Sequence, residues 1–391
     1  MNRLGVFFVG SIDEPTGAGA VVRSFKGGND IFAQNDIILD GVYSFDRVKQ
    51  GQDPIGVKNK SCFFKNAIQR FGKWILEKTP KGCGVIVDKL YFSKGERIVS
   101  VFHEEASKCD ILIFHDIFTF NAYINGSHWN GKQKLILILH TNGEVFRMLR
   151  IYYPKIVGSL YDKKLQHIED RCLGVASRIV FVSQLSAALF KTHYPCYADK
   201  VSVVYNGIES VHYKDPLFDG KLRIVTTGTV NARKNQVLLI KALGKIAGKM
   251  DVVLTVIGSG DKLIDCKKMA RELKVDRLID FMGTRKDVSD ILSRQNLFVM
   301  TSLDEGLPIS AIEALRAKLP VILTDVGGNK ELIRDNGYLI KPCLDDLVEC
   351  LCDFNLDVER QKEMSLKSYQ LFEERFTVER MIENYSQIIR K

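Results

Sequence analysis

Two glutamates lie eight positions apart in the segment TSLDEGLPISAIEALRAKLPVILTD, residues 301–325. Pro308 suits the first turn of a helix, so the pattern places Glu305 in a loop and Glu313 within that helix. Free N–H groups at a helix start bind anions, whereas carboxylates repel phosphate and accept hydrogen bonds from hydroxyl groups. The segment therefore predicts a ligand that carries both phosphate and sugar hydroxyls. A capping acid beside a solvated acid is the structural alternative.

A second segment, TTGTVNARKNQVLLIKAL at 226–243, runs from a strand through a glycine-containing loop into a helix. Arg233 and Lys234 are adjacent in that loop. Arginine offers a planar fork of donors and lysine a point charge, so the pair is suited to neutralising a diphosphate. A solvated helix start is the structural alternative.

The segment EPTGAGAVV at 14–22 follows the first predicted strand. Gly17 and Gly19 permit close backbone approach to a ligand. They match the first half of a dinucleotide fingerprint, but Val22 stands at its third small position, so the match is incomplete.

Two histidines end apolar runs. His140 follows KLILIL, where a side chain projects beyond the sheet and its imidazole can contact a sugar hydroxyl or take part in proton movement. His115 follows ILIF, and we expect a structural or acceptor-side role for it.

These residues need a frame of alternating strands and helices. Apolar, β-branched runs separated by helix-length segments indicate βαβ units and parallel sheets. The expected strands are 1–10, 111–114, 134–139, 178–183 and 201–207, then 223–228, 251–261, 278–283, 296–302, 320–325 and 337–341. A segment rich in Pro, Gly and charge at 210–223 separates the two series. We therefore expect an α/β fold with two doubly wound domains facing each other across a cleft, and ligands beyond the carboxyl ends of the strands.

Composition sets further limits. A chain of 391 residues is long enough for two domains. Its nine cysteines are odd in number and scattered, which is typical of reduced thiols in a cytoplasmic protein. Because Cys350 and Cys352 lack a second ligand pair, a zinc site is not expected. No apolar run is long enough to span a membrane.

Basic residues are concentrated in the first half. Residues 1–210 hold 27 Lys and Arg against 20 Asp and Glu, and the span 54–81 holds seven against one. Apolar residues at helical spacing in that span fit either a basic amphipathic helix on an anionic membrane or an ordinary core helix. The first reading predicts peripheral association with the inner face of the plasma membrane.

Taken together, the motifs resemble the retaining glycosyltransferases of family 4 with the GT-B fold, the glycosyl transferases of group 1. Five segments follow each other in the family's order over about residues 200–345: YNGIE, TTGTVNARKNQVLLIKAL, VIGSGD, MGTRKDVSDILSRQNLFVMTSLDEGLPISAIEAL and PVILTDVGGNKELI. Residues 25–130, on the acceptor side in that family, match little.

The resemblance implies roles for individual residues. His140 and Glu305 would act at the donor sugar, Glu313 would bind the ribose, and Gly17 and Gly19 would form the glycine loop. The donor diphosphate would contact Arg233, Lys234, Gly306, Leu307, Pro308 and Ile309, and the base would lie near Thr284, Arg285 and Lys286. Many members carry Arg directly after the glycine that ends the first strand of the second domain. Here Thr229 follows Gly228, and Arg233 would substitute.

The resemblance also implies a domain plan and a reaction. Residues 1–212 would form the acceptor-side domain, 213–371 the nucleotide-sugar domain, and 372–391 a helix returning to the first domain. The reaction would move a hexose from a nucleoside diphosphate sugar to an acceptor hydroxyl in cell-surface polysaccharide or glycoconjugate synthesis. A glycan or lipid-linked glycan would be the acceptor, with no cofactor, metal or nucleic acid involved.

Three other functions fit parts of the pattern. A sugar-nucleotide epimerase shares the architecture, and it would form product without any acceptor. A nicotinamide-dependent oxidoreductase would explain Gly17 and Gly19 but gives Glu305 and Glu313 no purpose. A non-catalytic partner subunit of a transferase would bind nucleotide without turnover or would not bind it.

Overall fold

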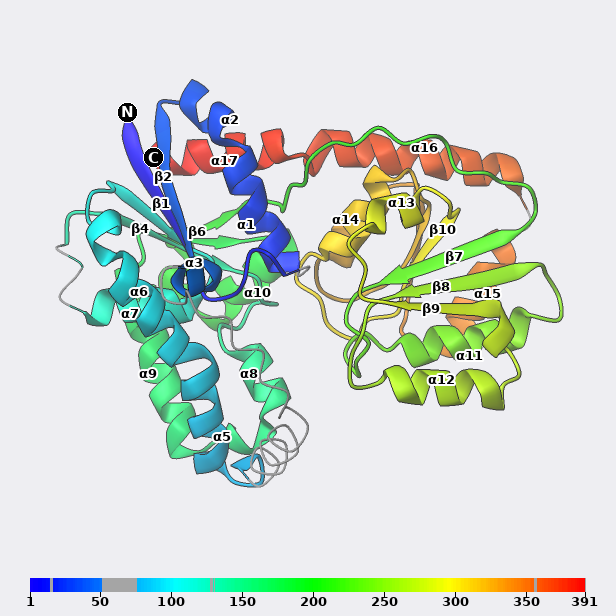
Figure 1. Ribbon diagram of the computed structural model, residues 1–391, viewed down its shortest axis with the longest axis horizontal. Helices are drawn as coiled ribbons and strands as arrows, with labels where there is room; N and C mark the ends of the chain where they lie inside the picture. The colour runs from blue at the N-terminus through cyan, green and yellow to red at the C-terminus, as the bar shows by residue number, and fades with distance from the viewer. Residues whose placement is uncertain (15–16, 51–75, 127–128, 130, 355–356, 391) are drawn as a thin grey trace. The chain divides into compact units, whose positions relative to one another are not determined.

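The computed structural model describes residues 1–391 apart from 15–16, 51–75, 127–128, 130, 355–356 and 391 (Figure 1). It divides into two compact units, Met1–Val204 with Ile382–Lys391 and Tyr205–Met381. The chain enters the second unit earlier than the boundary expected at 212/213. The reason is that Ile208 hydrogen-bonds to the far end of that unit, where its N–H binds Phe376 O at 3.0 Å and its carbonyl accepts from Val378 N at 3.2 Å.

The first unit contains a parallel sheet in the order β2-β1-β3-β4-β5-β6. Its strands are β1 Asn2–Phe8, β2 Ile37–Ser44, β3 Ile111–Phe114, β4 Lys134–Leu139, β5 Arg178–Phe181 and β6 Val201–Val203. The strand order reverses between β1 and β3, which makes that position the topological switch point of the sheet. Strands β5 and β6 end earlier than expected from the apolar runs.

Strand β2 was not among the expected strands. Its sequence, IILDGVYS, is interrupted by Asp40 and Gly41, which break the apolar pattern of a buried strand. The register shifts there, because Leu4 pairs with Leu39 but Gly5 pairs with Gly41. Asp40 is thus the extra residue, and its carboxylate accepts from Arg3 Nε at 2.7 Å on the neighbouring strand.

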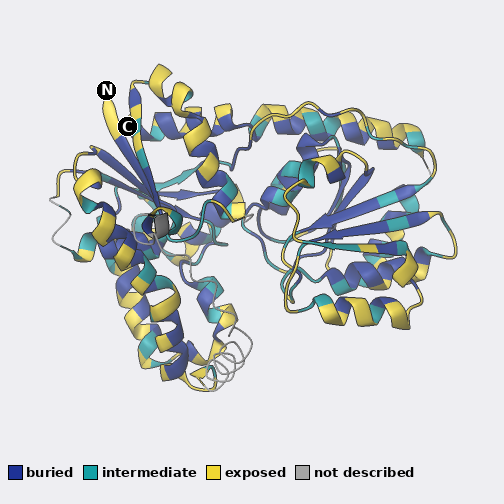
Figure 2. Cartoon of the chain, in the orientation of Figure 1, coloured by how far each residue is buried: buried dark blue, intermediate teal, exposed yellow. Residues whose placement is uncertain are grey.

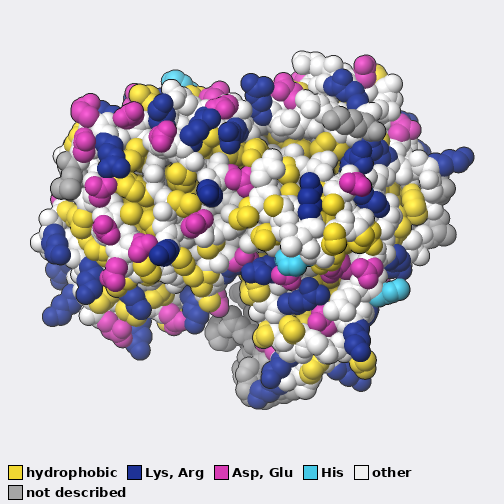
Figure 3. All heavy atoms as spheres, turned by 180° about the vertical axis from the view of Figure 1, so that it is seen from behind, with side chains coloured by type: hydrophobic (Ala, Val, Ile, Leu, Met, Phe, Trp, Pro, Cys, Tyr) yellow, Lys and Arg dark blue, Asp and Glu magenta, His cyan; other side chains and the backbone are white. Residues whose placement is uncertain are grey.

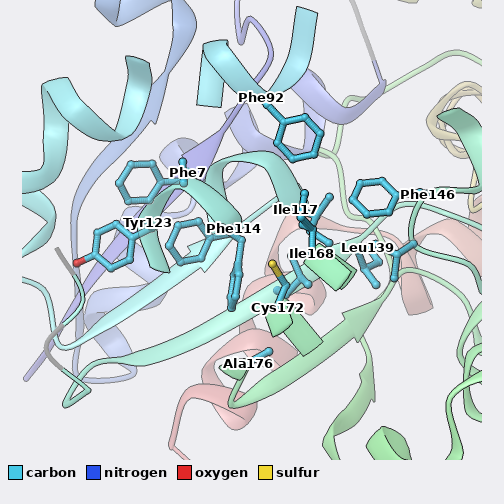
Figure 4. Packing of buried hydrophobic residues seen from close by; sticks show 14 of the residues in the cluster. Phe7, Phe92, Phe114, Ile117, Tyr123, Leu139, Phe146, Ile168, Cys172 and Ala176 are labelled. Carbon is cyan, nitrogen blue, oxygen red and sulfur yellow. The ribbon is translucent and has the colours of Figure 1, made fainter. Parts of the chain in front are cut away.

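Helices lie on both faces of this sheet, and the sides that they turn toward the rest of the unit are largely buried (Figure 2). The helices of the unit are α1 Gly17–Gly27, α2 Asn29–Gln34, α3 Phe45–Gln50, α5 Pro80–Val87, α6 Ser93–Ala106, α7 Ile117–Asn125, α8 Arg147–Tyr152, α9 Leu160–Val175, α10 Gln184–His193 and α17 Val378–Arg390, with short helices η1 Asp88–Phe92, η2 Pro154–Ile156 and η3 Pro195–Lys200. Aromatic residues fill the core, and Phe7 stacks on Phe114 with ring centroids 5.0 Å apart (Figure 4).

Helix α17 carries the chain from the second unit to the first. Its Tyr385 is buried, with its ring centroid 5.0 Å from that of Phe25 in α1. Lys134 donates from Nζ to the carbonyls of Ile388 and Ile389 at 3.0 and 3.1 Å, which places a cation at the negative end of the helix. The end of α17 is therefore part of the first unit.

The second unit contains a parallel sheet in the order β12-β11-β10-β7-β8-β9. Its strands are β7 Leu222–Thr227, β8 Val252–Ile257, β9 Ile279–Gly283, β10 Leu297–Met300, β11 Val321–Thr324 and β12 Gly337–Ile340. Its helices are α11 Gln236–Ile246, α12 Leu263–Glu272, α13 Val288–Leu292, α14 Ile309–Arg316, α15 Leu344–Phe354 and α16 Val358–Arg375, with η4 Asp276–Leu278 and η5 Gly327–Leu332. The order reverses between β7 and β10, and this is the dinucleotide-binding topology.

Two sequence expectations concern membranes and cysteines. Within the described ranges, no helix is both long and apolar enough to cross a membrane. Most of the span 54–81 lies outside the described residues, so its expected contact with a membrane is not addressed. None of the cysteines that the structure describes forms a disulfide. Four of them, Cys83, Cys109, Cys172 and Cys266, are buried.

Candidate donor-binding site

The carboxyl ends of β7 and β10 lie side by side at the switch point of the second unit. After β7 the chain forms the loop with Arg233 and Lys234 and enters α11. After β10 it forms the loop with Glu305 and enters α14. The two helices leave from neighbouring strands at the place where a doubly wound sheet opens a crevice for its ligand.

Glu305 lies between the two cations. Its Oε1 is 2.7 Å from Lys234 Nζ and 3.0 Å from Arg233 Nη1. The side chains are 6%, 11% and 22% exposed for Glu305, Lys234 and Arg233, so water screens these charges weakly. One carboxylate facing two cations leaves an excess of positive charge, which suits a bound anion.

The electrostatics of the cluster follow from its burial. Burial opposes the charge on Glu305, but Lys234 and Arg233 outweigh it and hold the pKa of the carboxyl below its ordinary value. Burial lowers the pKa of Lys234, with the neighbouring Arg233 acting in the same direction and Glu305 against it. A bound anion would supply the negative charge that this cluster lacks.

Hydrogen bonds fix the Glu305 loop from several sides. Leu303 N donates to Arg233 O at 2.8 Å, and Arg233 Nη1 donates to Asp304 O at 2.6 Å. Gly328 N donates to Gly306 O at 2.8 Å. These bonds occupy the carbonyls of Asp304 and Gly306 and the N–H of Leu303, so the backbone of the loop is held through both donors and acceptors.

Two further glycines permit close approach between backbone segments of the second unit. Gly327 has φ of +52°, and a Cβ there would lie 1.6 Å from Glu305 O. A Cβ at Gly258, which has φ of +138°, would lie 1.9 Å from Gly228 O. Only glycine fits either place. The sequence shows a glycine directly after β8 and another at the third position after β11, but it does not show which atom each one approaches.

The loop ends at the N-terminus of α14. Pro308 stands at the N-cap rather than in the first turn, which corrects the expected helix start by one residue, and the helix begins at Ile309. Pro308 makes no side-chain cap, and the N–H groups of a first helical turn have no partner within the helix. The helix dipole adds positive potential at the same end. Glu313 lies in the next turn of α14 and is partly exposed.

Thr284, Arg285 and Lys286 follow β9 and are exposed. Thr284 Oγ1 donates to Ser259 Oγ at 3.2 Å, which joins this loop to the loop after β8. Arg285 pairs with Asp287 at 2.8 and 2.6 Å, so its guanidinium is committed within its own loop. Because the strands are parallel, these three residues and the Glu305 cluster all follow the carboxyl ends of strands, at the same end of the sheet.

The remaining expected residues belong to the first unit. Gly17 and Gly19 begin helix α1 rather than forming a loop, with Gly17 exposed and Gly19 buried. His140 directly follows β4, and its Nε2 lies 3.2 Å from Nδ1 of His115, which follows β3. Burial lowers the pKa of His140 to about 4 and holds the pKa of His115 well below its ordinary value. Both imidazoles are therefore neutral near pH 7.

Asp116 was not among the expected residues. Its carboxylate accepts from Val9 N at 2.7 Å and caps α7 by accepting from Thr119 N at 2.7 Å, so it connects the ends of β1 and β3. Burial raises the pKa of Asp116 to about 6, although these hydrogen bonds act against the rise. A helix-capping Asp after the strand ILIF was the signal that the sequence offered.

Metal ligands are a separate matter. In the part of the chain that the structure describes, no three or more His, Cys, Asp or Glu side chains come together in a group that could hold a metal ion.

Two family models match adjacent parts of the chain. The model described as Glycosyltransferase Family 4 matches residues 86–211, and the one described as Glycosyl transferases group 1 matches residues 208–370. The second match contains every expected residue of the second unit.

Similar proteins include bacterial glycosyltransferases. The O-antigen biosynthesis glycosyltransferase WbnH of Escherichia coli is 31% identical over 166 residues, which is 42% of this chain and 44% of that protein. The UDP-Gal:alpha-D-GlcNAc-diphosphoundecaprenol alpha-1,3-galactosyltransferase of Escherichia coli is 26% identical over 160 residues, 36% of this chain and 41% of that protein. The matched part thus spans less than half the length of each relative.

Solved structures resemble the whole chain. HepE of Anabaena, crystallised with UDP, aligns with a TM-score of 0.67 at 17% identity and covers 100% of this chain and 99% of its own. Sucrose-phosphate synthase of Thermosynechococcus elongatus gives a TM-score of 0.73 at 14% identity, covering 100% and 98%. At this identity the likeness shows a shared fold of two Rossmann-like domains.

Proposed function

Because the chain belongs to the family 4 glycosyltransferases with the GT-B fold, we propose that it is a retaining glycosyltransferase using a nucleoside diphosphate sugar. The acceptor would be a hydroxyl group of a growing bacterial cell-surface polysaccharide or glycoconjugate. The activities for which the similar E. coli proteins are named, O-antigen biosynthesis and galactosyl transfer from UDP-Gal, support this class of reaction.

One observation carries the proposal. A buried carboxylate, Glu305, lies within 3.0 Å of both Arg233 and Lys234 at the switch point, directly before a helix start without a side-chain cap. Cations and first-turn N–H groups bind a diphosphate, whereas the carboxylates suit sugar hydroxyls. A ligand with both kinds of group satisfies the whole arrangement.

In the proposed complex, Arg233, Lys234 and the N–H groups of Gly306, Leu307 and Ile309 hold the diphosphate, which carries growing charge as its bond to the sugar breaks. Glu305 accepts a hydrogen bond from the donor sugar. Glu313, one turn into α14, accepts from the ribose hydroxyls. This preorganised positive potential lowers the barrier, because it is strongest for the charge that develops on the leaving group.

The proposed chemistry is a front-face substitution. The bond between the anomeric carbon and the diphosphate oxygen breaks, and a bond to the acceptor oxygen forms on the same face of the sugar. The acceptor's proton passes to the departing diphosphate. We assign no side chain as nucleophile, and we propose from the family resemblance that His140 contacts the donor sugar.

We further propose that turnover requires no metal, since two cations and a helix start supply the charge that a divalent ion would otherwise provide. The test is turnover in the presence of a chelator. A donor that is consumed only when a divalent ion is added back would overturn this part while leaving the transferase assignment standing.

We propose a glycan or lipid-linked glycan as acceptor, with binding of the protein to an anionic membrane surface. The named acceptor of one relative, a diphosphoundecaprenol-linked sugar, supports a lipid-linked acceptor. On the face drawn in Figure 3, lysines and arginines lie among acidic and hydrophobic side chains rather than forming one continuous basic surface. Retention by liposomes with anionic lipid at low salt tests the proposal, and its absence would remove the membrane from it.

The decisive experiment is release of nucleoside diphosphate from a panel of UDP-, GDP-, ADP- and TDP-sugars. UDP-sugars come first, because UDP-Gal is the named donor of a relative. Wild type is compared with Lys234→Ala and Glu313→Ala, and with the exposed control variants Lys268→Ala and Glu359→Ala. Selective turnover of one donor, suppressed only by the first pair, supports the site. Turnover of the sugar nucleotide to an isomer without acceptor would instead indicate an epimerase.

A further inference from the structure

The carboxyl ends of β3 and β4 hold two histidines in direct contact. The strands pair in parallel, with Phe114 opposite Leu137, and each is followed at once by an imidazole: His115 directly after β3 and His140 directly after β4. The rings lie nearly parallel, at 17° with centroids 5.4 Å apart, and His115 Nδ1 is 3.2 Å from His140 Nε2. This is a hydrogen bond between two imidazoles.

His115 is the fixed member of the pair. Only 3% of the residue is exposed. Its backbone N–H donates to Phe7 O at 2.9 Å, and the ring of Phe25 stands at 87° to its imidazole with centroids 5.1 Å apart. His140 is less buried than His115. The hydrogen bond therefore joins the more accessible ring of His140 to the buried, closely packed ring of His115.

Two neutral imidazoles can share this bond only if one nitrogen donates and the other accepts. The state of His140 Nε2 is then set by His115, and the other nitrogen of the same neutral ring, Nδ1, must take the opposite state. If His140 changed its tautomer, His115 would have to change its tautomer as well. Nε2 of His115 has no hydrogen-bond partner among the described residues with which it could exchange a proton.

We propose that His115 is a positioning residue that holds His140 in one ring orientation and one tautomer. A ligand approaching His140 would then meet Nδ1 with a fixed role as donor or acceptor. The functional meaning rests on the proposed transferase activity, in which His140 contacts the donor sugar. The tautomer itself is a property of the unliganded protein and can be measured without any substrate.

The first test is NMR of the imidazole nitrogens in ¹⁵N-histidine-labelled wild-type protein near pH 7, with the His140 signals assigned by their loss in His140→Gln. We expect a single neutral tautomer for His140. In His115→Leu, which removes the shared bond, we expect an average of both tautomers. In His115→Asn, whose amide occupies the position of Nδ1, we expect the single tautomer to return. The exposed His167→Asn serves as control.

The second test is kinetic, on the donor that the panel identifies. We expect His115→Leu to lower kcat by about tenfold or more, the lower range for a misoriented acid–base or contact group, with little change in donor KM. His115→Asn should recover most of kcat, which a purely structural loss would not predict.

The two tests distinguish the positioning role of His115 from the proposed transferase activity. Averaged tautomers in the wild type, or a protonated His140 at pH 7, overturn the positioning role whatever the activity. If His115→Leu does not fold, the wild-type spectrum alone decides the matter. If no donor is turned over but His140 shows one tautomer that His115→Leu abolishes, the positioning role stands and the proposed function fails.

Discussion

Lys234 and Arg233 keep a buried carboxylate charged at the end of strand β10, and this cluster is the smallest unit on which the proposed activity depends. Both cations contact the same oxygen of Glu305. Removing any member changes the balance of buried charge as well as the ligand contacts. Experiments on single residues must therefore separate stability from turnover.

We expect Lys234→Met to lower donor turnover on the order of 100-fold, because one preorganised donor to the leaving group is lost. Thermal stability should also fall, since the buried carboxylate of Glu305 loses one of its two cationic partners. The double variant Lys234→Met with Glu305→Gln should recover thermal stability without recovering turnover. Turnover within a few-fold of wild type in the single variant would show that Lys234 does not contact the diphosphate.

The histidine pair predicts a pH dependence of stability. The pKa of His140 is lowered to about 4 in the folded protein, against about 6.5 in the unfolded chain. As pH falls through that window the unfolded chain takes up a proton that the folded protein does not, so the free energy of unfolding decreases. The contribution is on the order of 2 kcal/mol. Asp116, whose pKa is raised to about 6, acts in the opposite direction.

The measurement therefore compares the loss of unfolding free energy between two pH values in the wild type and in His140→Gln. Urea unfolding at pH 7 and pH 4.5 is followed by tryptophan fluorescence, which reports on the first unit because Trp129 packs against its hydrophobic core. His140→Gln should lose less stability than wild type between the two pH values. Equal losses would mean that His140 titrates normally.

At the scale of elements, the loop between β10 and α14 is held by residues from distant parts of the chain. Gly327, at the start of η5, approaches Glu305 O directly. Asn206, at the start of the second unit, is buried and donates from Nδ2 to Leu307 O at 3.2 Å across 101 positions of sequence. The precision of the site thus depends on neighbours that touch only its backbone.

Gly327→Ala should displace this loop. The new methyl would lie 1.6 Å from Glu305 O, and alanine is also strained at φ of +52°. Gly220→Ala is the matched control, because Gly220 has φ of +85° but open space around its Cβ position. Strain alone costs about 1–3 kcal/mol. We expect both variants to lose stability, but only Gly327→Ala to weaken binding of the nucleoside diphosphate that the donor panel identifies, measured by calorimetry. Equal affinity for that nucleotide in both would contradict the packing argument.

Asn206 offers a graded test of the same loop. Asn206→Ala removes one hydrogen bond, worth about 1 kcal/mol net. Asn206→Asp has nearly the same shape but places a carboxylate against the carbonyl of Leu307, so it should be worse. We expect kcat to fall in the order wild type, Ala, Asp. An Asp variant as active as wild type would indicate that this contact does not position the loop.

At the scale of the whole molecule, the chain crosses between the units twice, near Val204 and near Met381. The second crossing runs through α17, whose last residues belong to the core of the first unit. Tyr385 is 1% exposed and packs against Phe25, and a Cβ at Gly28 would lie 1.6 Å from Ile382 Cδ1. The first unit is thus completed by residues at the far end of the sequence.

Tyr385→Ala should destabilise the first unit by about 3–5 kcal/mol, the usual cost of a large aromatic cavity. Tryptophan fluorescence should register the loss. Affinity at 25 °C for the nucleoside diphosphate that the donor panel identifies should be retained, because the expected nucleotide contacts lie in the second unit. A loss of that binding in a protein that still shows native fluorescence would place the nucleotide against the first unit instead.

The sequence by itself determined the elements and their class. Apolar runs such as ILIF and KLILIL predicted strands, their alternation with helices predicted parallel sheets, and Pro308 located a helix start to within one residue. These signals are local, since they arise from side-chain period and backbone restriction within a few residues. Strand β2 was missed because Asp40 and Gly41 obscure its period at the register shift.

Only the tertiary structure decided which of these residues meet. Strand order brings Arg233 within hydrogen-bond distance of Asp304, 71 positions away, and His115 against His140. It also shows why Gly327 must be glycine, because the clashing atom belongs to another loop. Contacts of this kind depend on non-local pairing of strands, which leaves no periodic trace in the segments that it joins.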